Sequence, residues 1–172
     1  MPKKSGFTLV ELLIVISIIG ILASIGLASF NSSQMKSRDA KRKSDLKQIA
    51  NALELYYNDK GQYPAPVGDA GGNLQGCGAG AATACSWGNL TTPFSNTTTG
   101  TVYMTRLPAD PSNNSHYYYR ATQDVSGLYT KYQIYTRLEN SQDKSIITGI
   151  DLDCGTGQNT CNWGISSSNT TP

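Results

Sequence analysis

The sequence is poor in the residues on which catalysis and metal binding depend. Among its 172 residues there is a single histidine, His116, and none of the serines lies in a Gly-x-Ser-x-Gly sequence. No phosphate-binding glycine loop precedes a helical segment. The histidine also has no further ligands at the spacing that zinc sites show. We therefore expect no enzyme, no catalytic residue, no cofactor and no zinc site.

Charge of one sign is not in large excess either. Lys and Arg number 14 and Asp and Glu 12, a formal net charge of +2. Nucleic-acid binding usually requires a larger basic surplus interleaved with aromatic residues, so we expect no such contact. Six of the basic residues fall in residues 36–47 (KSRDAKRKSDLK). This run could contact lipid head groups or acidic neighbours, or it could be a solvated helix face.

Proline is missing between Phe7 and Tyr63, so no residue there forces a helix to end. Residues 7–30 carry only one charge, that of Glu11. A helix of these 24 residues would rise about 36 Å, enough to cross a hydrocarbon core of ~30 Å. The sequence thus predicts a hydrophobic, transmembrane-length helix over residues 7–30.

Residues 31–60 continue this helix with an amphipathic pattern. Apolar residues such as Leu46 and Leu53 recur at three- and four-residue steps on one face. Gly61 then provides a helix stop signal. We expect one helix over about residues 7–60, whose second half offers an apolar stripe to a sheet.

Cysteine is scarce but arranged in two short-range pairs, Cys77 with Cys85 and Cys154 with Cys161. Neither spacing matches the Cys-x2-Cys pattern of zinc sites. The pairs fit two disulfides formed in an oxidising compartment. Both lie in one pattern, C-G-x-G followed by C-x-W-G. It indicates either a stapled loop whose tryptophan packs against the disulfide or a surface feature that presents the tryptophan.

The remaining residues, 61–172, predict a loop-rich globular head. Strand patterns occur at 116–122 and 128–139, separated by a turn sequence that suits a hairpin. A weaker strand pattern covers 145–152, and the last 18 residues read as loop or edge strand. The sequence predicts an α+β fold in which the C-terminal half of the long helix packs on a small antiparallel sheet.

Glu11 is the feature of the apolar run that requires an explanation. A carboxylate inside a bilayer costs about 2.5–3.5 kcal/mol on insertion scales. An ordinary signal peptide cut after Gly26 or Ala28, or an uncut anchor, gives this charge no partner. Cleavage after Gly6 would instead create a positive α-amine on Phe7, one helical turn away. In a bundle of such helices, Glu11 could neutralise the Phe7 amine of a neighbour, and the helix dipole also favours a carboxylate there.

The segment KKSGFTLVELLIVISIIGILA resembles the class III signal segment of type IV pilins and of the pseudopilins of type II secretion systems. Residues 43–64 (KSDLKQIANALELYYNDKGQYP) look like the exposed half-helix of that family. Residues 107–111 (LPADP) are similar to a loop that precedes the strands in major pseudopilins. The specific part of the resemblance covers roughly residues 1–64.

The resemblance implies a pilin fold and a processing route. Residues 1–6 would be a leader removed by the prepilin peptidase, which reads Gly6 and cuts between Gly6 and Phe7. Phe7 would then be N-methylated. Glu11 would direct insertion into the filament, whose core residues 7–30 would form.

The same resemblance implies partners and a location. The chain would form a homo-oligomeric filament with the help of an inner-membrane pilus or secretion assembly platform. It would lie in the cytoplasmic membrane as a precursor and then in an extracellular or cell-surface filament, or in the periplasm if it forms a pseudopilus. We therefore expect a subunit of a type IV pilus-like filament. The alternatives are a major pseudopilin-like subunit of a type II secretion system and a secreted or membrane-anchored binding domain that does not polymerise.

Two features depart from the family pattern. Many type IV pilins have a proline partway along the buried helix, and this chain has none there. The calcium-binding loop of major pseudopilins is also not clearly reproduced. The loops contain four aspartates: Asp110, Asp124, Asp151 and Asp153. They could gather around Ca²⁺, which takes six to eight oxygen ligands, or they could be solvated carboxylates.

Overall fold

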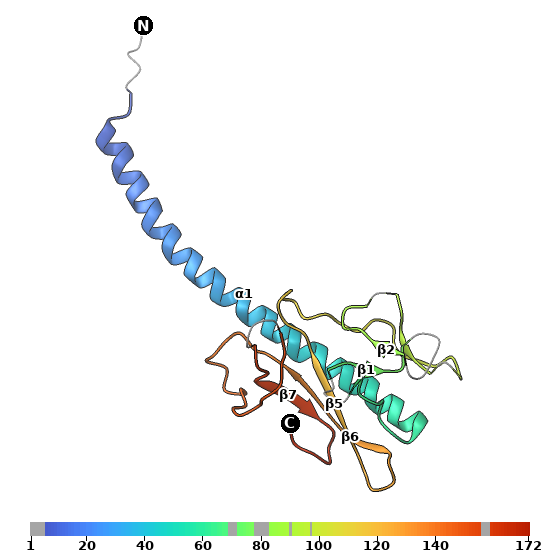
Figure 1. Ribbon diagram of the computed structural model, residues 1–172. Coiled ribbons are helices and arrows are strands. Elements are labelled where there is room, and N and C mark those ends of the chain that lie inside the picture. Colours follow the sequence, from blue (N-terminus) through green and yellow to red (C-terminus); the bar gives the residue numbers. More distant parts are fainter. Residues whose placement is uncertain (1–5, 69–71, 78–82, 90, 97, 156–158) are drawn as a thin grey trace. The chain divides into compact units, whose positions relative to one another are not determined.

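The computed structural model describes residues 6–68, 72–77, 83–89, 91–96, 98–155 and 159–172. The chain divides into two compact units, residues 1–37 and residues 38–172. One helix, α1 (Leu9–Lys60), contributes residues to both units (Figure 1). The strands that follow it are β1 (Leu74–Gln75), β2 (Ala84–Cys85), β3 (Phe94–Ser95), β4 (Val102–Met104), β5 (Tyr118–Gln123), β6 (Tyr129–Thr136) and β7 (Trp163–Ser166).

Helix α1 matches the helix predicted over about residues 7–60, except that it begins at Leu9. It ends where the sequence places the stop signal. Gly61 adopts a left-handed conformation with φ 70°, and its N–H donates to the carbonyl of Tyr57 at 2.7 Å. A glycine takes this conformation without the Cβ penalty of other residues, which is why helices often end at one.

The main sheet of the second unit has three antiparallel strands in the order β5-β6-β7. Its β5–β6 hairpin confirms the strands predicted at 116–122 and 128–139. The turn is held by Asp124, whose Oδ1 accepts hydrogen bonds from the N–H groups of Ser126 (2.8 Å) and Leu128 (3.1 Å). Strand β7 is the edge strand that the last 18 residues contain.

The strand predicted at 145–152 is wrong, because these residues form turns and extended loop without a ladder of their own. The local bonds of Asp143 explain part of this difference. Its Oδ1 accepts hydrogen bonds from the N–H of Ser145 (2.9 Å) and from the Ser145 hydroxyl (2.6 Å). Such side-chain bonds to nearby backbone compete with a sheet ladder.

Two small hairpins, β1–β2 and β3–β4, lie in the region predicted to be loop. Each of their strands is two or three residues long. A strand that short contains at most one full period of alternation, so the sequence pattern carries little sign of it.

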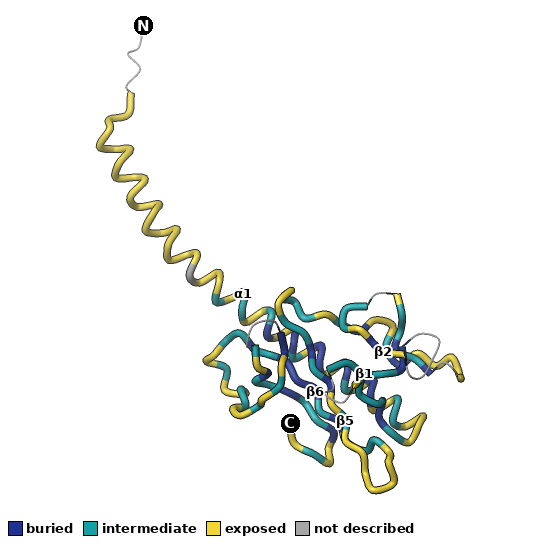
Figure 2. Tube along the Cα trace, in the orientation of Figure 1, coloured by how far each residue is buried: buried dark blue, intermediate teal, exposed yellow. Residues whose placement is uncertain are grey.

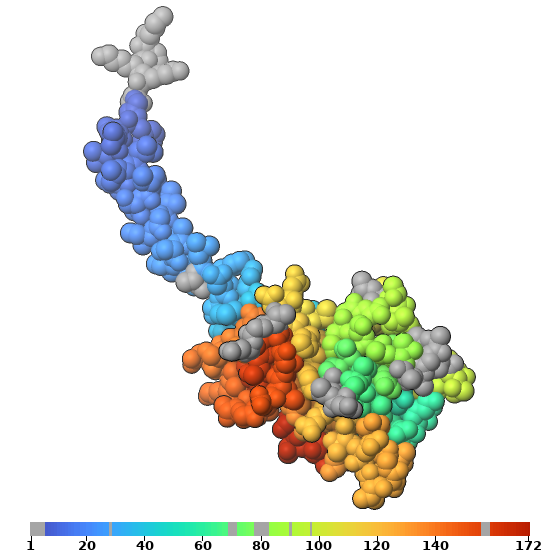
Figure 3. Space-filling model, viewed as in Figure 1, coloured from blue at the N-terminus to red at the C-terminus, as the bar shows by residue number. Residues whose placement is uncertain are grey.

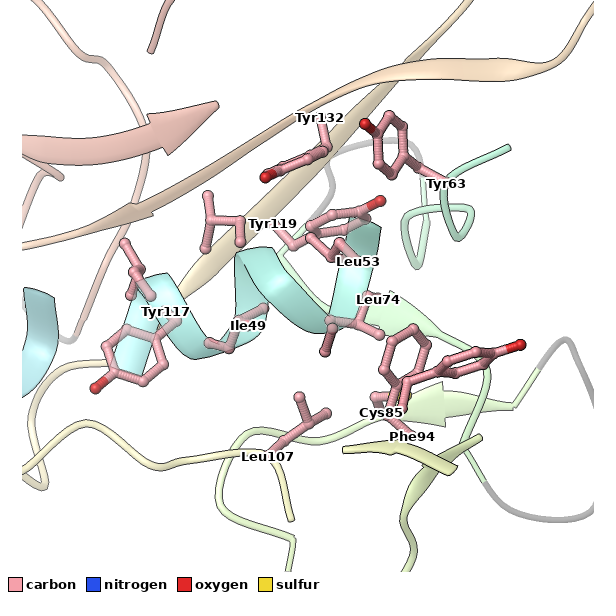
Figure 4. Packing of buried hydrophobic residues seen from close by; sticks show 14 of the residues in the cluster. Ile49, Leu53, Tyr63, Leu74, Cys85, Phe94, Leu107, Tyr117, Tyr119 and Tyr132 are labelled. Atoms are coloured by element: carbon pink, nitrogen blue, oxygen red, sulfur yellow. The ribbon is translucent and has the colours of Figure 1, made fainter. Parts of the chain in front are cut away.

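The core forms between the second half of α1 and the inner face of the main sheet. Ile49 and Leu53 of α1 are buried against tyrosines of the sheet, with apolar residues of the small hairpins on the other side (Figure 4). Tyr117 and Tyr119 are fully buried, and the Tyr119 hydroxyl donates to the carbonyl of Pro64 at 2.7 Å. Buried positions are confined to the second unit, as Figure 2 shows.

Candidate functional site: the N-terminal segment and the basic run

The start of α1 is built by a reciprocal pair of hydrogen bonds between Thr8 and Glu11. The Thr8 N–H donates to Glu11 Oε2 at 2.8 Å, and the Glu11 N–H donates to Thr8 Oγ1 at 3.3 Å. The Thr8 hydroxyl also donates to Glu11 Oε2, at 2.7 Å. This is a capping box, in which the first residue before the helix and the third residue within it satisfy each other's free N–H groups.

From the sequence alone, Glu11 is interpreted as a charge without a partner in its own chain, and Thr8 is not identified as part of this site. The signal was present as the sequence Thr-x-x-Glu directly before an apolar run. Within the single chain, the Glu11 carboxylate has a local partner. Both of its hydrogen bonds end on Oε2, so Oε1 can still accept from another group.

The expected cleavage point lies immediately before this cap. Gly6 is exposed, and a Cβ built on it would meet no atom within 4 Å. The Phe7 side chain is 88% exposed. The fold of the chain itself therefore places no steric demand for glycine at this position. Residues 1–5, which complete the expected leader, lie outside the described residues.

Almost every described residue of the first unit is exposed (Figure 2). Helix α1 is long and apolar enough to cross a membrane, judged by length and composition. Between residues 7 and 30, 15 large apolar side chains are 48–88% exposed: Phe7, Leu9, Val10, Leu12, Leu13, Ile14, Val15, Ile16, Ile18, Ile19, Ile21, Leu22, Ile25, Leu27 and Phe30. A surface of this kind requires a bilayer or other protein chains to cover it.

The basic run at 36–47 is only in part a solvated helix face: Lys36, Lys41 and Lys47 are exposed, whereas other residues of the run pair with carboxylates of the second unit. Arg42 is completely buried and binds Asp110 through two parallel hydrogen bonds of 2.8 and 2.7 Å. It also pairs with Asp39 and Glu139, each at 2.8 Å. Burial alone would lower the pKa of Arg42, but the hydrogen bond and charge of Asp110 outweigh it and raise the pKa, so the side chain stays charged.

Three further basic residues of the run are paired within the chain. Arg38 binds Glu139, Lys41 binds Asp45 at 2.7 Å, and Lys43 binds Asp143 at 2.7 Å. The hydrogen bond from Arg38 lowers the pKa of Glu139, and the hydrogen bond from Lys43 lowers that of Asp143. Three residues of the run, Arg38, Arg42 and Lys43, therefore fasten loops of the second unit to α1.

The four aspartates considered for calcium do not share one site. Asp110 binds Arg42, Asp124 holds the β5–β6 turn, and Asp153 accepts a hydrogen bond from the N–H of Gly155 at 2.9 Å. Asp151 lines a separate hollow. Across the described part of the chain, no three His, Cys, Asp or Glu side chains gather as a metal site would require.

The structure joins Cys77 to Cys85 and Cys154 to Cys161. Trp87 packs against the main core cluster, which contains the first disulfide, and its Nε1–H donates to the carbonyl of Gly72 at 2.9 Å. Trp163 packs against that same cluster, whereas Cys154 and Cys161 belong to a second one. Residues 78–82 and 156–158, parts of the repeated pattern, lie outside the described residues.

Comparison with known proteins places these features in a family context. A family model described as the prokaryotic N-terminal methylation motif matches residues 1–27. The type II secretion system core protein G of Aeromonas hydrophila is 31% identical over 166 residues, which cover 95% of this chain and 94% of that protein. The corresponding protein of Escherichia coli strain K12 is 28% identical over 164 residues, 95% of this chain and 94% of the relative.

A further similarity is confined to the N-terminal part. The type IV major pilin protein PilA of Myxococcus xanthus is 40% identical over 62 residues, which cover 36% of this chain and 28% of that protein. No solved structure matches the chain significantly.

Proposed function

Because the chain belongs to the family of type IV pilins and type II secretion pseudopilins, we propose that it is a structural subunit of a pilus-like filament. The observation that carries this proposal is the exposed apolar surface of residues 7–30 with its single charge at Glu11. Lipid would cover this surface in the precursor, and the helices of other copies would cover it in the filament.

Proteolytic processing would prepare the subunit to leave the lipid and enter the filament. The prepilin peptidase would cut between Gly6 and Phe7, and the new α-amine of Phe7 would be N-methylated. The open space around Gly6 supports recognition by the peptidase as the reason for glycine here, because among the described residues no atom lies within 4 Å of a Cβ built at this position. The small residue would thus serve the peptidase.

In the filament, Glu11 would pair with the Phe7 amine of a neighbouring subunit. The capping box leaves Glu11 Oε1 able to accept a further hydrogen bond. The amine could therefore bind without first breaking the cap. Pairing a carboxylate with an ammonium group inside an apolar bundle removes the cost of an isolated charge there and favours one register between helices.

Filament formation is tested by shearing cells and examining the released fraction by electron microscopy with antibodies to the second unit. We expect labelled fibres from cells that produce the protein and none from cells lacking the prepilin peptidase. A protein that remains in the membrane uncut, or is released as a monomer, would support the non-polymerising binding domain and overturn the proposal.

A second candidate, a major subunit of a secretion pseudopilus, is favoured by one observation. The core protein G relatives of Aeromonas hydrophila and Escherichia coli each align over 94% of their length, whereas the similarity to the Myxococcus xanthus pilin covers 28% of that protein. A pseudopilus would be short and periplasmic. Loss of secreted proteins from the medium on deletion, without loss of surface fibres, would favour this candidate over a surface pilus.

A further inference from the structure

The segment that follows β6, residues 139–147, is attached to α1 by side chains of the basic run. Asp39 accepts hydrogen bonds from the N–H groups of Glu139 (2.9 Å) and Asn140 (2.8 Å). Arg38 and Arg42 bind the Glu139 carboxylate. These contacts fix the first two residues of the 139–147 segment, which lies beside α1 in the second unit (Figure 3).

The rest of the segment is organised around the Lys43 ammonium group. Its Nζ donates to Asp143 Oδ2 at 2.7 Å and to the Ser145 hydroxyl at 2.8 Å. The ring of Trp163 on β7 lies 5.6 Å from the same nitrogen, within the range of a cation–π contact. One cation thus joins three parts of the chain: α1, the 139–147 segment and the edge strand.

Asp143 in turn shapes the segment itself. Its Oδ1 accepts from Ser145, its N–H donates to the carbonyl of Asn140 at 3.0 Å, and its carbonyl accepts from the N–H of Ile146 at 3.2 Å. The carboxylate, the Ser145 hydroxyl and five backbone groups form one connected network. Lys43 supplies the positive charge to which that network is bound.

A divalent ion does not fit this arrangement. Calcium needs six to eight oxygen ligands, whereas Lys43 already occupies one oxygen of Asp143 and the hydroxyl of Ser145. The neighbouring carboxylate, that of Glu139, is bound by two arginines.

We propose that the Lys43 ammonium group is the cation that orders the 139–147 segment, which therefore folds without a bound divalent metal ion. Lys43 is a positioning residue in this role. The proposal concerns the single subunit and does not depend on filament formation.

The test is amide hydrogen exchange of the full-length protein in detergent, with excess EDTA or with added calcium chloride. We expect wild-type exchange in residues 139–147 to be the same in both solutions. Lys43→Met should raise that exchange about tenfold or more in both, since a hydrogen-bonded charge is lost. Exchange in β5 and β6 should not change, which shows that the fold is intact.

Two further variants make the result specific. Lys47→Met removes an exposed lysine of the same helix and should leave the segment unchanged. Asp143→Asn keeps Lys43 but removes its carboxylate partner, so it should loosen the segment even if Lys43→Met does not fold. Loosening of the wild-type segment by EDTA alone, or unchanged exchange in both Lys43→Met and Asp143→Asn, would overturn the proposal.

Discussion

Glu11 has one partner within its own chain, and we propose a second partner in a neighbouring subunit. Thr8 binds the carboxylate in the capping box, which fixes the start of α1. A capping box accounts for glutamate or glutamine at this position, because either can accept the N–H of Thr8. It does not account for a negative charge. The helix dipole favours a negative charge at this position, and a positive amine from another subunit would pair with it.

Two substitutions separate the charge of Glu11 from its capping role. Glu11→Ala removes both, whereas Glu11→Gln removes the charge and keeps an acceptor for Thr8. We expect both variants to be cleaved normally and to reduce the sheared filament fraction about tenfold or more, because the neighbour's amine loses its partner. Immunoblots of the precursor and of the sheared fraction provide the two measurements. Normal filaments from Glu11→Gln would show that the cap, and not the charge, is what assembly requires.

Glu139 and Asp143 predict how the second unit responds to acid. Hydrogen bonds from Arg38 and Lys43, respectively, hold the pKa values of these carboxyls below their usual ones. The stability that they contribute is present above the unfolded-state pKa of about 4 and is lost as the pH falls through the lower folded-state values. We therefore expect the free energy of unfolding to fall steeply below about pH 4.

This pH dependence is measured by denaturant unfolding of the full-length protein in detergent, followed by tryptophan fluorescence, since both tryptophans lie in the second unit. Asp143→Asn should weaken the dependence because one titrating carboxyl is removed. Equal stability at neutral pH and at about pH 3 would contradict the assigned ion pairs.

At the scale of elements, the sequence predicted α1 well and its connections poorly. The apolar periodicity of Leu46, Ile49 and Leu53 and the stop at Gly61 depend on neighbours in the sequence, so both could be recognised. The partners of Arg42 could not be recognised from the sequence, because Asp110 lies 68 residues away along the chain and Glu139 about a hundred. The sequence shows that residues 36–47 are rich in basic side chains, but it does not show which of them the fold buries.

The strands follow the same division. The alternating pattern at 128–139 predicted a strand, and β6 forms there with Tyr132 and Ile134 buried in the main core cluster. The strand predicted at 145–152 is absent from the structure. The Asp143 side chain accepts a hydrogen bond from the backbone N–H of Ser145, and the alternation of apolar and polar residues gives no sign of such local bonds.

Arg42→Met tests whether α1 is joined to its loops through this buried cation. The substitution leaves the carboxylates of Asp39 and Asp110 buried without their main partner, so we expect it to lower the free energy of unfolding by about 3–5 kcal/mol. Lys47→Met, on the exposed face of the same helix, should change it by no more than about 0.5 kcal/mol. The same fluorescence assay measures both. A loss below about 1 kcal/mol for Arg42→Met would mean that the ion-pair network contributes little to stability.

The whole molecule combines two units with opposite solvent requirements. The first exposes apolar side chains throughout and cannot remain bare in water. The second has its own core, two disulfides and a polar, loop-rich surface suited to an oxidising aqueous compartment. A subunit that begins in a membrane and ends in a filament, with its head outside, meets both requirements.

The N-terminus of the native protein tests this account most directly. We predict that mass spectrometry of the mature chain, purified from its own cells, finds a polypeptide that begins at Phe7 and carries a methyl group on the α-amine. A chain that begins at Met1, or one that begins near Ser29 after removal of the whole apolar segment, would contradict the account.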